Sequence, residues 1–150
     1  MSACNEWPKI SIITPSYNQG SYIEETILSV IGQLYPNLEY IVIDGGSVDD
    51  SLNILSKYNQ YITFWESKYD KGQADAINKG FSLASGDILA WINSDDMYLP
   101  GTLRYIGSLV KSKMFSDPGI LFGNCIHIDE KVMKAYASNN VVKSHKQLDI

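Results

Sequence analysis

The chain has 150 residues, of which 45% are hydrophobic and 19% are charged, so it is long enough for one globular domain and too short for two comfortable ones. Its formal net charge is −5, and no run of lysine or arginine interrupts this acidic balance. Sequence-independent binding of nucleic acids requires a basic face, so the composition argues against a nucleic-acid partner.

Cysteine content and hydropathy indicate the compartment. Cys4 and Cys125 are too few for a disulfide framework or a four-ligand zinc site, so we expect two free thiols. The first residues lack the basic segment and apolar core of a signal peptide. No apolar run approaches the roughly 18 residues of a transmembrane segment. We therefore expect a cytoplasmic protein, with peripheral attachment to the inner face of the membrane left open.

Short apolar segments alternate with amphipathic ones from the start of the chain. The β-branched segment 9–14 predicts a buried strand. A helix over 21–34 should follow, beginning with a capping box formed by Ser21 and Glu24. Its core-facing stripe would consist of Ile23, Ile27, Val30, Ile31 and Leu34.

The same alternation continues through the middle of the chain. A second strand is predicted at 38–44, and Ser47 can cap the short helix that should follow it. A third strand is predicted at 61–66. The next segment, 73–84, predicts a helix whose buried face would carry Ala74, Ile77, Phe81 and Ala84.

The last predicted elements follow the helix over 73–84. Segment 87–93 predicts a fourth, buried strand, and Pro100 suits the first position of another helix. Segments 119–129 and 131–137 predict a further pair of strands. The core-facing stripe of the helix after Pro100 would be Leu103, Ile106 and Val110.

Strands that alternate with helices and are apolar on both faces predict an α/β fold, a three-layer sandwich with a mostly parallel central sheet. In such sheets, ligands bind beyond the carboxyl ends of the strands. The polar segments that follow the predicted strands should therefore meet at one binding edge. They are 14–18, 44–47, 70–73 and 93–96.

The common nucleotide and hydrolase motifs are absent. The sequence contains no G-x-G-x-x-G after the first strand, no G-x-x-x-x-G-K-[ST] and no G-x-S-x-G. His127 and His145 have no metal-ligand spacing, and we interpret both as incidental. Asp95 and Asp96 would repel each other by roughly 4 kcal/mol at about 4 Å and an effective dielectric near 20. A hard divalent cation, completed by waters and substrate phosphates, would offset that repulsion.

Four stretches occur together in a characteristic order and spacing. They are ISIITPSYNQGSYIEETILSVIGQLYPNLEYIVIDGGSVDDS, DKGQADAINKGF, ASGDILAWINSDDMYLPGTL and FGNCIHID. Together they resemble the N-terminal half of a family 2 glycosyltransferase with the Rossmann-like GT-A fold. The resemblance implies transfer of a sugar from a nucleotide diphosphate sugar of UDP, GDP or dTDP type to a saccharide or lipid-linked acceptor. It also implies inversion and a requirement for Mn²⁺ or Mg²⁺.

The resemblance further implies roles for residues at the expected edge. Tyr17 would pack on the nucleotide, Asp44 would accept a hydrogen bond from a pyrimidine base, and Lys71 would contact phosphate at a helix N-terminus. The structural alternatives are an ordinary strand-end aromatic, a turn aspartate and a solvated lysine. The nucleotide-binding set implied in full is Thr14, Pro15, Ser16, Tyr17, Asn18, Asp44, Gly45, Gly46, Lys71, Gly72, Gln73, Asp75, Asn78, Ser94 and Asp95.

The adjacent aspartates match the metal-binding motif of the family. Neighbouring side chains of extended backbone point to opposite sides, so the two carboxylates can do different jobs. We assign Asp96 as the main metal ligand and Asp95 as shared between ribose and metal. The family often has a further aspartate where this chain has Asn93. The structural alternative is a solvated acidic turn.

An inverting transfer also needs a general base on the acceptor hydroxyl. Asp129, Glu130 and Asp149 are the late acids, and none lies in a base motif, so we expect the base beyond Ile150 and leave the catalytic residue unknown. Residues 1–150 would form a single GT-A type domain, truncated on the acceptor side. Two alternatives are a catalytically silent nucleotide-binding fragment and a nucleotidyltransferase. The latter would need a basic glycine-rich loop, which TPSYNQGS does not provide.

Overall fold

The computed structural model describes residues 7–112, 119–121, 123, 126–129 and 134–137. The chain divides into two compact units between Met114 and Phe115, and each is described by itself. Several residues considered above lie outside the described part of the chain: Cys4, Cys125, Glu130, His145 and Asp149.

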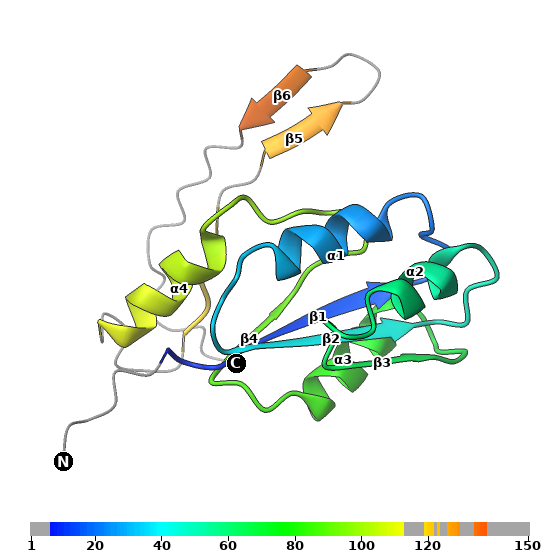
Figure 1. Ribbon diagram of the computed structural model, residues 1–150, viewed down its shortest axis with the longest axis horizontal. Helices are drawn as coiled ribbons and strands as arrows, with labels where there is room; N and C mark the ends of the chain where they lie inside the picture. Colours follow the sequence, from blue (N-terminus) through cyan, green and yellow to red (C-terminus); the bar gives the residue numbers. More distant parts are fainter. Residues whose placement is uncertain (1–6, 113–118, 122, 124–125, 130–133, 138–150) are drawn as a thin grey trace, which may run out of the picture. The chain divides into compact units, whose positions relative to one another are not determined.

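The first unit is built around a four-stranded parallel sheet in the order β3-β2-β1-β4 (Figure 1). Its strands are β1 (Ile10–Ser16), β2 (Leu38–Asp44), β3 (Phe64–Ser67) and β4 (Ile88–Trp91). β1 pairs in parallel with both β2 and β4, and β2 pairs in parallel with β3. All four carboxyl ends therefore lie at one edge of the sheet, and the α/β prediction is confirmed.

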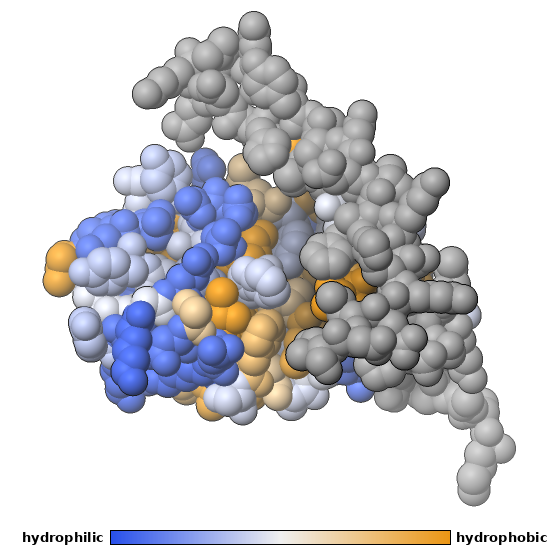
Figure 2. Space-filling model, turned by 180° about the vertical axis from the view of Figure 1, so that it is seen from behind, coloured by the Kyte–Doolittle hydropathy of each residue, from blue (hydrophilic) through white to orange (hydrophobic). Residues whose placement is uncertain are grey.

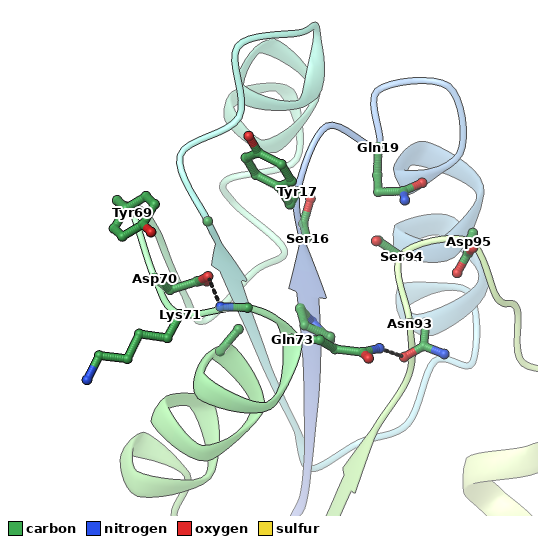
Figure 3. A pocket seen from close by; sticks show the side chains of 14 residues that line it. Ser16, Tyr17, Gln19, Tyr69, Asp70, Lys71, Gln73, Asn93, Ser94 and Asp95 are labelled. Atoms are coloured by element: carbon green, nitrogen blue, oxygen red, sulfur yellow. Dashed lines mark hydrogen bonds between the residues drawn. The ribbon is translucent and has the colours of Figure 1, made fainter.

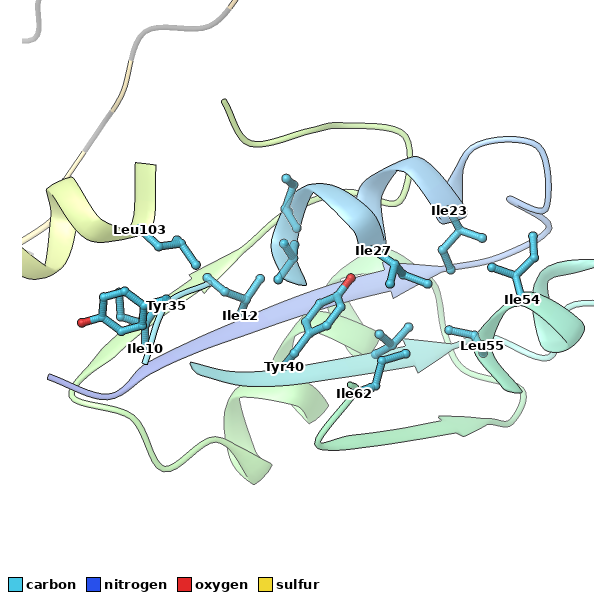
Figure 4. Packing of buried hydrophobic residues seen from close by; sticks show 13 residues of the cluster. Ile10, Ile12, Ile23, Ile27, Tyr35, Tyr40, Ile54, Leu55, Ile62 and Leu103 are labelled. Carbon is cyan, nitrogen blue, oxygen red and sulfur yellow. The ribbon is translucent and has the colours of Figure 1, made fainter. Parts of the chain in front are cut away.

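Helices cover both faces of this sheet. They are α1 (Ile23–Ile31), α2 (Ser51–Lys57), α3 (Gln73–Leu83) and α4 (Thr102–Lys111). Because successive strand side chains point to opposite faces, β1 and β2 contribute to two separate cores. The larger core joins the two strands to α1, α2 and α4 (Figure 4). Its buried members are Ile10, Ile12, Ile23, Ile27, Val30, Tyr35, Tyr40, Val42, Ile54, Leu55, Ile62, Ile92 and Leu103.

The smaller core lies between the opposite face of the sheet and α3. It consists of Ile13, Ile41, Ile43 and Ala76. Sequence periodicity placed Ala74 on the buried face of α3, which is wrong because Ala74 is exposed. The buried positions of this helix are Ala76 and Gly80, and a Cβ at Gly80 would overlap the side chain of Ile13. The helix is therefore closely packed through its smallest residues.

The predicted capping box of α1 is not formed. Tyr22 is the N-cap residue, and no side chain caps the helix. Glu24 instead accepts hydrogen bonds from Lys57 Nζ at 2.6 Å and from the Tyr58 hydroxyl at 2.7 Å, which tie α1 to α2. The helix ends at Ile31, so Leu34 leaves the predicted stripe and is 77% exposed.

The cap expected from Ser47 is also absent from α2, which begins at Ser51 and has no side-chain cap. The hydroxyl of Ser47 donates to Asp44 instead. β3 begins at Phe64 rather than at residue 61 because the backbone N–H of Tyr61 closes a turn onto Tyr58.

β4 was predicted to be buried on both sides, and this is wrong. It is an edge strand of the described sheet, where Leu89 is 50% exposed and Trp91 is 54% exposed. Figure 2 shows that apolar residues are exposed beside hydrophilic ones on this face of the molecule. The following helix begins at Thr102, with Gly101 as its N-cap at φ 83°, so Pro100 lies before the helix and not at its first position.

The second unit contains an antiparallel pair, β5 (Ile126–Asp129) and β6 (Lys134–Ala137). The pairing of Ile126 with Ala137 confirms the strand pair expected in this region, although both strands are shorter than predicted. His127 and Asp129 belong to β5. No helix within the described ranges is long and apolar enough to cross a membrane.

Candidate functional site

A pocket of about 730 Å³ lies at the carboxyl edge of the sheet, where the polar strand ends were expected to meet (Figure 3). The turns after β1, β2 and β4, the loop after β3 and the start of α3 form its walls. Its lining residues are Pro15, Ser16, Tyr17, Gln19, Gly45, Tyr69, Asp70, Lys71, Gly72, Gln73, Ala76, Asn93, Ser94 and Asp95.

Most of the residues singled out from the sequence line this pocket, but some do not. Those away from its lining are Thr14, Asn18, Asp44, Gly46, Asp75, Asn78 and Asp96. The pocket also includes Gln19, Tyr69, Asp70, Ala76 and Asn93, which the nucleotide-binding set omitted. The sequence could have predicted Tyr69 and Asp70 as pocket residues, because they directly precede Lys71 in the loop after β3.

One end of the pocket is aromatic and acidic. Tyr17 is 62% exposed and Tyr69 is 91% exposed, so both rings are open to a ligand. Asp70 lies close to them, and its Oδ1 accepts a hydrogen bond of 2.8 Å from the backbone N–H of Gly72 (Figure 3). Exposed aromatic faces beside a carboxylate suit a flat ring that carries an N–H donor.

Asp44, by contrast, is an organiser of the turn after β2. It is fully buried, and Oδ2 accepts from the N–H of Gly46 (3.1 Å), the N–H of Ser47 (2.8 Å) and the hydroxyl of Ser67 (2.6 Å). Oδ1 accepts from the Ser47 hydroxyl at 2.5 Å. Gly46 adopts φ 86°, a conformation that favours glycine and lets its N–H point back to Asp44.

The turns after β1 and β2 are joined through Asn18. Its backbone has φ 53°, which asparagine tolerates better than most residues. The N–H of Asn18 donates to the Ser47 hydroxyl at 2.7 Å, and its Oδ1 accepts from the N–H of Val48 at 3.0 Å. Asn18 therefore fixes the shape of the turn that presents Tyr17.

The last residues of β1 differ in their partners. Thr14 is buried, and its hydroxyl is 3.1 Å from the Tyr40 hydroxyl, inside the larger core. Ser16 is 5% exposed and lines the pocket. Its hydroxyl has no hydrogen-bond partner within the described part of the chain. A buried hydroxyl without a partner is costly, so Ser16 is a ready contact for a bound ligand.

The start of α3 borders the centre of the pocket. Gly72 is its N-cap at φ 107°, and the N–H of Lys71 donates to Asp75 at 3.2 Å. The ammonium group of Lys71 extends away from the labelled residues around Asn93 (Figure 3). Asn78 is exposed further along the helix. This helix end offers its backbone N–H groups rather than the lysine charge to the pocket in the observed conformation.

The opposite end of the pocket is formed by the turn after β4. Gln73 Nε2 donates to Asn93 Oδ1 at 2.7 Å, and Asn93 Nδ2 donates to Asp96 Oδ2 at 2.9 Å. This chain of hydrogen bonds connects α3 to the acidic turn. Asp95 lines the pocket, whereas Asp96 is exposed and outside its lining.

The donor set fits a hard cation of the Mg²⁺ or Mn²⁺ type. Asp95 and Asp96 supply carboxylate oxygens, and Mg²⁺ is commonly bound by one or two carboxylates together with waters and substrate phosphates. No cluster of three or more acidic, histidine or cysteine side chains occurs among the residues that the structure describes. The turn therefore fits a cation completed by a ligand better than a closed metal cage.

The sequence matches Glycosyl transferase family 2 over residues 11–141. The chain belongs to this family. An uncharacterized glycosyltransferase of Rickettsia felis is 32% identical over 126 residues, covering 83% of this chain and 21% of that protein. An uncharacterized glycosyltransferase of Mycobacterium tuberculosis, MT1564, is 41% identical over 92 residues, covering 61% of this chain and 35% of that protein.

Solved structures of glycosyltransferases show the same architecture. S. aureus TarS 1–349 in complex with UDP-GlcNAc aligns with a TM-score of 0.65 and 27% identity, covering 71% of this chain and 32% of TarS 1–349. The mannosyltransferase PcManGT from Pyrobaculum calidifontis, in complex with GDP-Man and Mn²⁺, aligns with a TM-score of 0.62 and 24% identity. The alignment covers 71% of this chain and 32% of PcManGT. These likenesses confirm the GT-A fold. The family 2 chain described here spans about a fifth to a third of the length of these relatives.

Proposed function

We propose that this family 2 domain binds a nucleotide diphosphate sugar in the pocket at the carboxyl edge of its sheet and serves its transfer, with inversion, to an acceptor. The observation that carries the proposal is the division of the pocket into two chemically distinct ends. Tyr17, Tyr69 and Asp70 form an aromatic and acidic end, whereas Asn93, Ser94 and Asp95 form an oxygen-rich end. A nucleotide diphosphate has the same division between its base and its charged phosphates.

The pocket offers a contact for each part of such a ligand. A base can stack on the open rings of Tyr17 and Tyr69. The unpartnered hydroxyl of Ser16 can pair with a ligand oxygen or N–H group. The N–H groups at the start of α3, beside Gly72, favour an anion. TarS with bound UDP-GlcNAc supports this class of ligand.

Asp95, which lines the oxygen-rich end, and Asp96, which lies just outside the lining, would hold Mn²⁺ or Mg²⁺ there. When bound there, the cation would supply Lewis-acid neutralisation of the departing diphosphate. Asn93 would orient Asp96 by the hydrogen bond it donates, and Gln73 would hold Asn93 in turn. Two structural neighbours solved with Mn²⁺, PcManGT and the glucosyl-3-phosphoglycerate synthase of Mycobacterium tuberculosis, support this choice of cation.

The acceptor side of the reaction is proposed on chemistry alone. Inversion requires a general base near the acceptor hydroxyl, and we propose that residues beyond Ile150 supply it. We propose that the acceptor is a saccharide or a lipid-linked molecule. We also propose a cytoplasmic location, and a position at the inner face of the membrane if the acceptor is lipid-linked. A second candidate function is a catalytically silent nucleotide-binding module, because none of the late acids Asp129, Glu130 and Asp149 lies in a base motif.

Calorimetric titration with UDP, GDP and dTDP, with and without Mn²⁺, tests the donor site. We expect binding of at least one nucleotide to tighten by about tenfold or more when Mn²⁺ is present. Circular dichroism must first show that the protein is folded. Complete absence of metal-dependent binding by the folded protein would contradict the proposal. Sugar transfer by the 150-residue chain itself would exclude the silent alternative.

Alanine variants of the two aspartates separate their roles. We expect Asp96→Ala to lose the Mn²⁺ dependence of nucleotide binding, and Asp95→Ala to weaken binding both with and without the cation. Glu25→Gln is the matched control because Glu25 is an exposed acid on α1 that does not line the pocket. Retention of the full Mn²⁺ effect in Asp96→Ala would show that the main ligand has been misassigned.

A further inference from the structure

Two carboxylates, those of Asp44 and Asp70, lie near the aromatic end of the pocket. Only one of them is available to a ligand. Asp44 is fully buried and already accepts hydrogen bonds from Gly46, Ser47 and Ser67 through both of its oxygens. Because Asp44 is enclosed and lies outside the pocket lining, a ligand N–H could reach it only by opening this hydrogen-bonded turn, which is costly.

Asp70 has the opposite environment. It lines the pocket, and its Oδ1 is held by the N–H of Gly72 at 2.8 Å. Its Oδ2 has no hydrogen-bond partner in the described residues. The carboxylate is therefore fixed in orientation through one oxygen and keeps the other for a ligand.

Gly45 provides the space that this carboxylate occupies. A Cβ at position 45 would lie 3.1 Å from Oδ2, 3.2 Å from Oδ1 and 3.3 Å from Cγ of Asp70. Each of these separations is shorter than an ordinary carbon contact of about 3.5–4.0 Å. Any side chain at residue 45 would therefore compete with Asp70 for the same wall of the pocket. The two residues form a matched pair, contributed by the turn after β2 and the loop after β3.

We propose that Asp70 is the specificity residue that reads the nucleotide base, and that it accepts the imide N–H of uracil or thymine. The inference rests on the proposed nucleotide-binding function and replaces Asp44 as the base-reading carboxylate. The ring of the base lies against Tyr17 or Tyr69, whose exposed faces border the same end of the pocket.

The number of free acceptor atoms selects the base. Uracil and thymine present one N–H between two carbonyl groups, which matches the single free oxygen of Asp70. Guanine presents two adjacent donors and is best matched by a carboxylate that offers both oxygens. In this pocket Oδ1 already accepts from the Gly72 N–H, so the second donor of guanine would have to share that oxygen with Gly72. UDP and dTDP should therefore bind more tightly than GDP.

Asp70→Asn is the most direct test because asparagine has nearly the same shape. With its amide oxygen kept on the Gly72 N–H, asparagine places its NH2 group where Oδ2 stood, and that group cannot accept from the base N–H. We expect Asp70→Asn to bind UDP about 10- to 100-fold more weakly in the presence of Mn²⁺. Glu25→Gln, an exposed acid on α1, should leave the affinity unchanged.

UDP methylated at N3 of uracil identifies the atom that Asp70 reads. The methyl group removes the imide N–H, so the wild-type protein should bind N3-methyl-UDP about 10- to 100-fold more weakly than UDP. Asp70→Asn should show little difference between the two ligands. Gly45→Ala, which crowds the Asp70 carboxylate, should weaken UDP binding in the same direction while leaving Asp44 in place.

The outcomes separate this inference from the proposed function. If the wild-type protein binds no nucleotide diphosphate, the proposed function fails. If it binds UDP with Mn²⁺ but Asp70→Asn binds equally well and still rejects N3-methyl-UDP, only the assignment of Asp70 fails. A wild-type preference for GDP over UDP would also overturn the assignment.

Discussion

Replacing Glu39 by glutamine tests a buried charge at the amino-terminal ends of the strands, opposite the pocket. Glu39 is 7% exposed, and its carboxylate accepts hydrogen bonds from Lys9 Nζ at 2.6 Å and from the N–H and hydroxyl of Ser85, both at 2.7 Å. The Ser11 hydroxyl donates to it at 2.5 Å. These contacts join β1, β2 and the segment between α3 and β4.

The magnitude follows from the pKa of Glu39. Burial alone would raise this pKa, but the hydrogen bonds from Lys9, Ser11 and Ser85 outweigh burial and lower it from 4.5 to about 2. At about 1.36 kcal/mol per pH unit the shift corresponds to about 3 kcal/mol, which solvent screening around Lys9 reduces to about 1–2 kcal/mol. The folded pKa lies below the unfolded value, so this stabilisation is fully present above the unfolded pKa. It is lost as the pH falls from 4.5 to about 2.

We expect Glu39→Gln to lower the free energy of unfolding by about 2 kcal/mol near pH 7, because the glutamine amide places a donor among donors. The melting temperature should fall by about 4–8 °C. Urea unfolding followed by tryptophan fluorescence at several pH values measures the effect. The difference from wild type should shrink toward about pH 3. A difference that is absent near pH 7, or equally large at about pH 3, would refute the reasoning.

Two further predictions concern packing and turn structure. Gly80→Ala should lower the free energy of unfolding measured in urea by about 1–3 kcal/mol, because its new methyl group overlaps Ile13. Ser82→Ala, on the exposed side of α3, is the control and should change stability by less than about 0.5 kcal/mol. Asp44→Asn should destabilise by about 1–3 kcal/mol, because one amide end faces donors such as the Ser47 N–H; unchanged urea unfolding would contradict the role assigned to Asp44.

The strands and the binding edge could be predicted because their signals are local. β2 was predicted at 38–44 and observed at Leu38–Asp44, since a run of β-branched and aromatic residues bounded by turn residues defines a buried strand. The alternation of strands and helices then implied parallel pairing. Parallel pairing brings every carboxyl end to one edge, so the location of the pocket followed without knowledge of any long-range contact.

The division of labour between Asp44 and Asp70 could not be predicted in this way. Both are single aspartates in polar turns, and their neighbours in sequence do not distinguish them. Asp44 is enclosed because the Ser67 hydroxyl, at the end of β3, reaches it across the sheet at 2.6 Å. Asp70 is open because Gly45, far from it in sequence, leaves room for it. Such long-range contacts decide which carboxylate is a structural anchor and which can serve a ligand.

Asn93 shows how the structure tolerates its adjacent aspartates without an additional acid. A carboxylate at position 93 would lie beside Asp96 and add a third negative charge to the turn. The amide of Asn93 instead donates to Asp96 Oδ2 at 2.9 Å and accepts from Gln73 at 2.7 Å, so it supplies a neutral bridge from α3 to the acid pair. Part of the repulsion that pointed to a cation is therefore offset within the protein itself. The remaining carboxylate oxygens stay available at the end of the pocket where a diphosphate would bring its own charge.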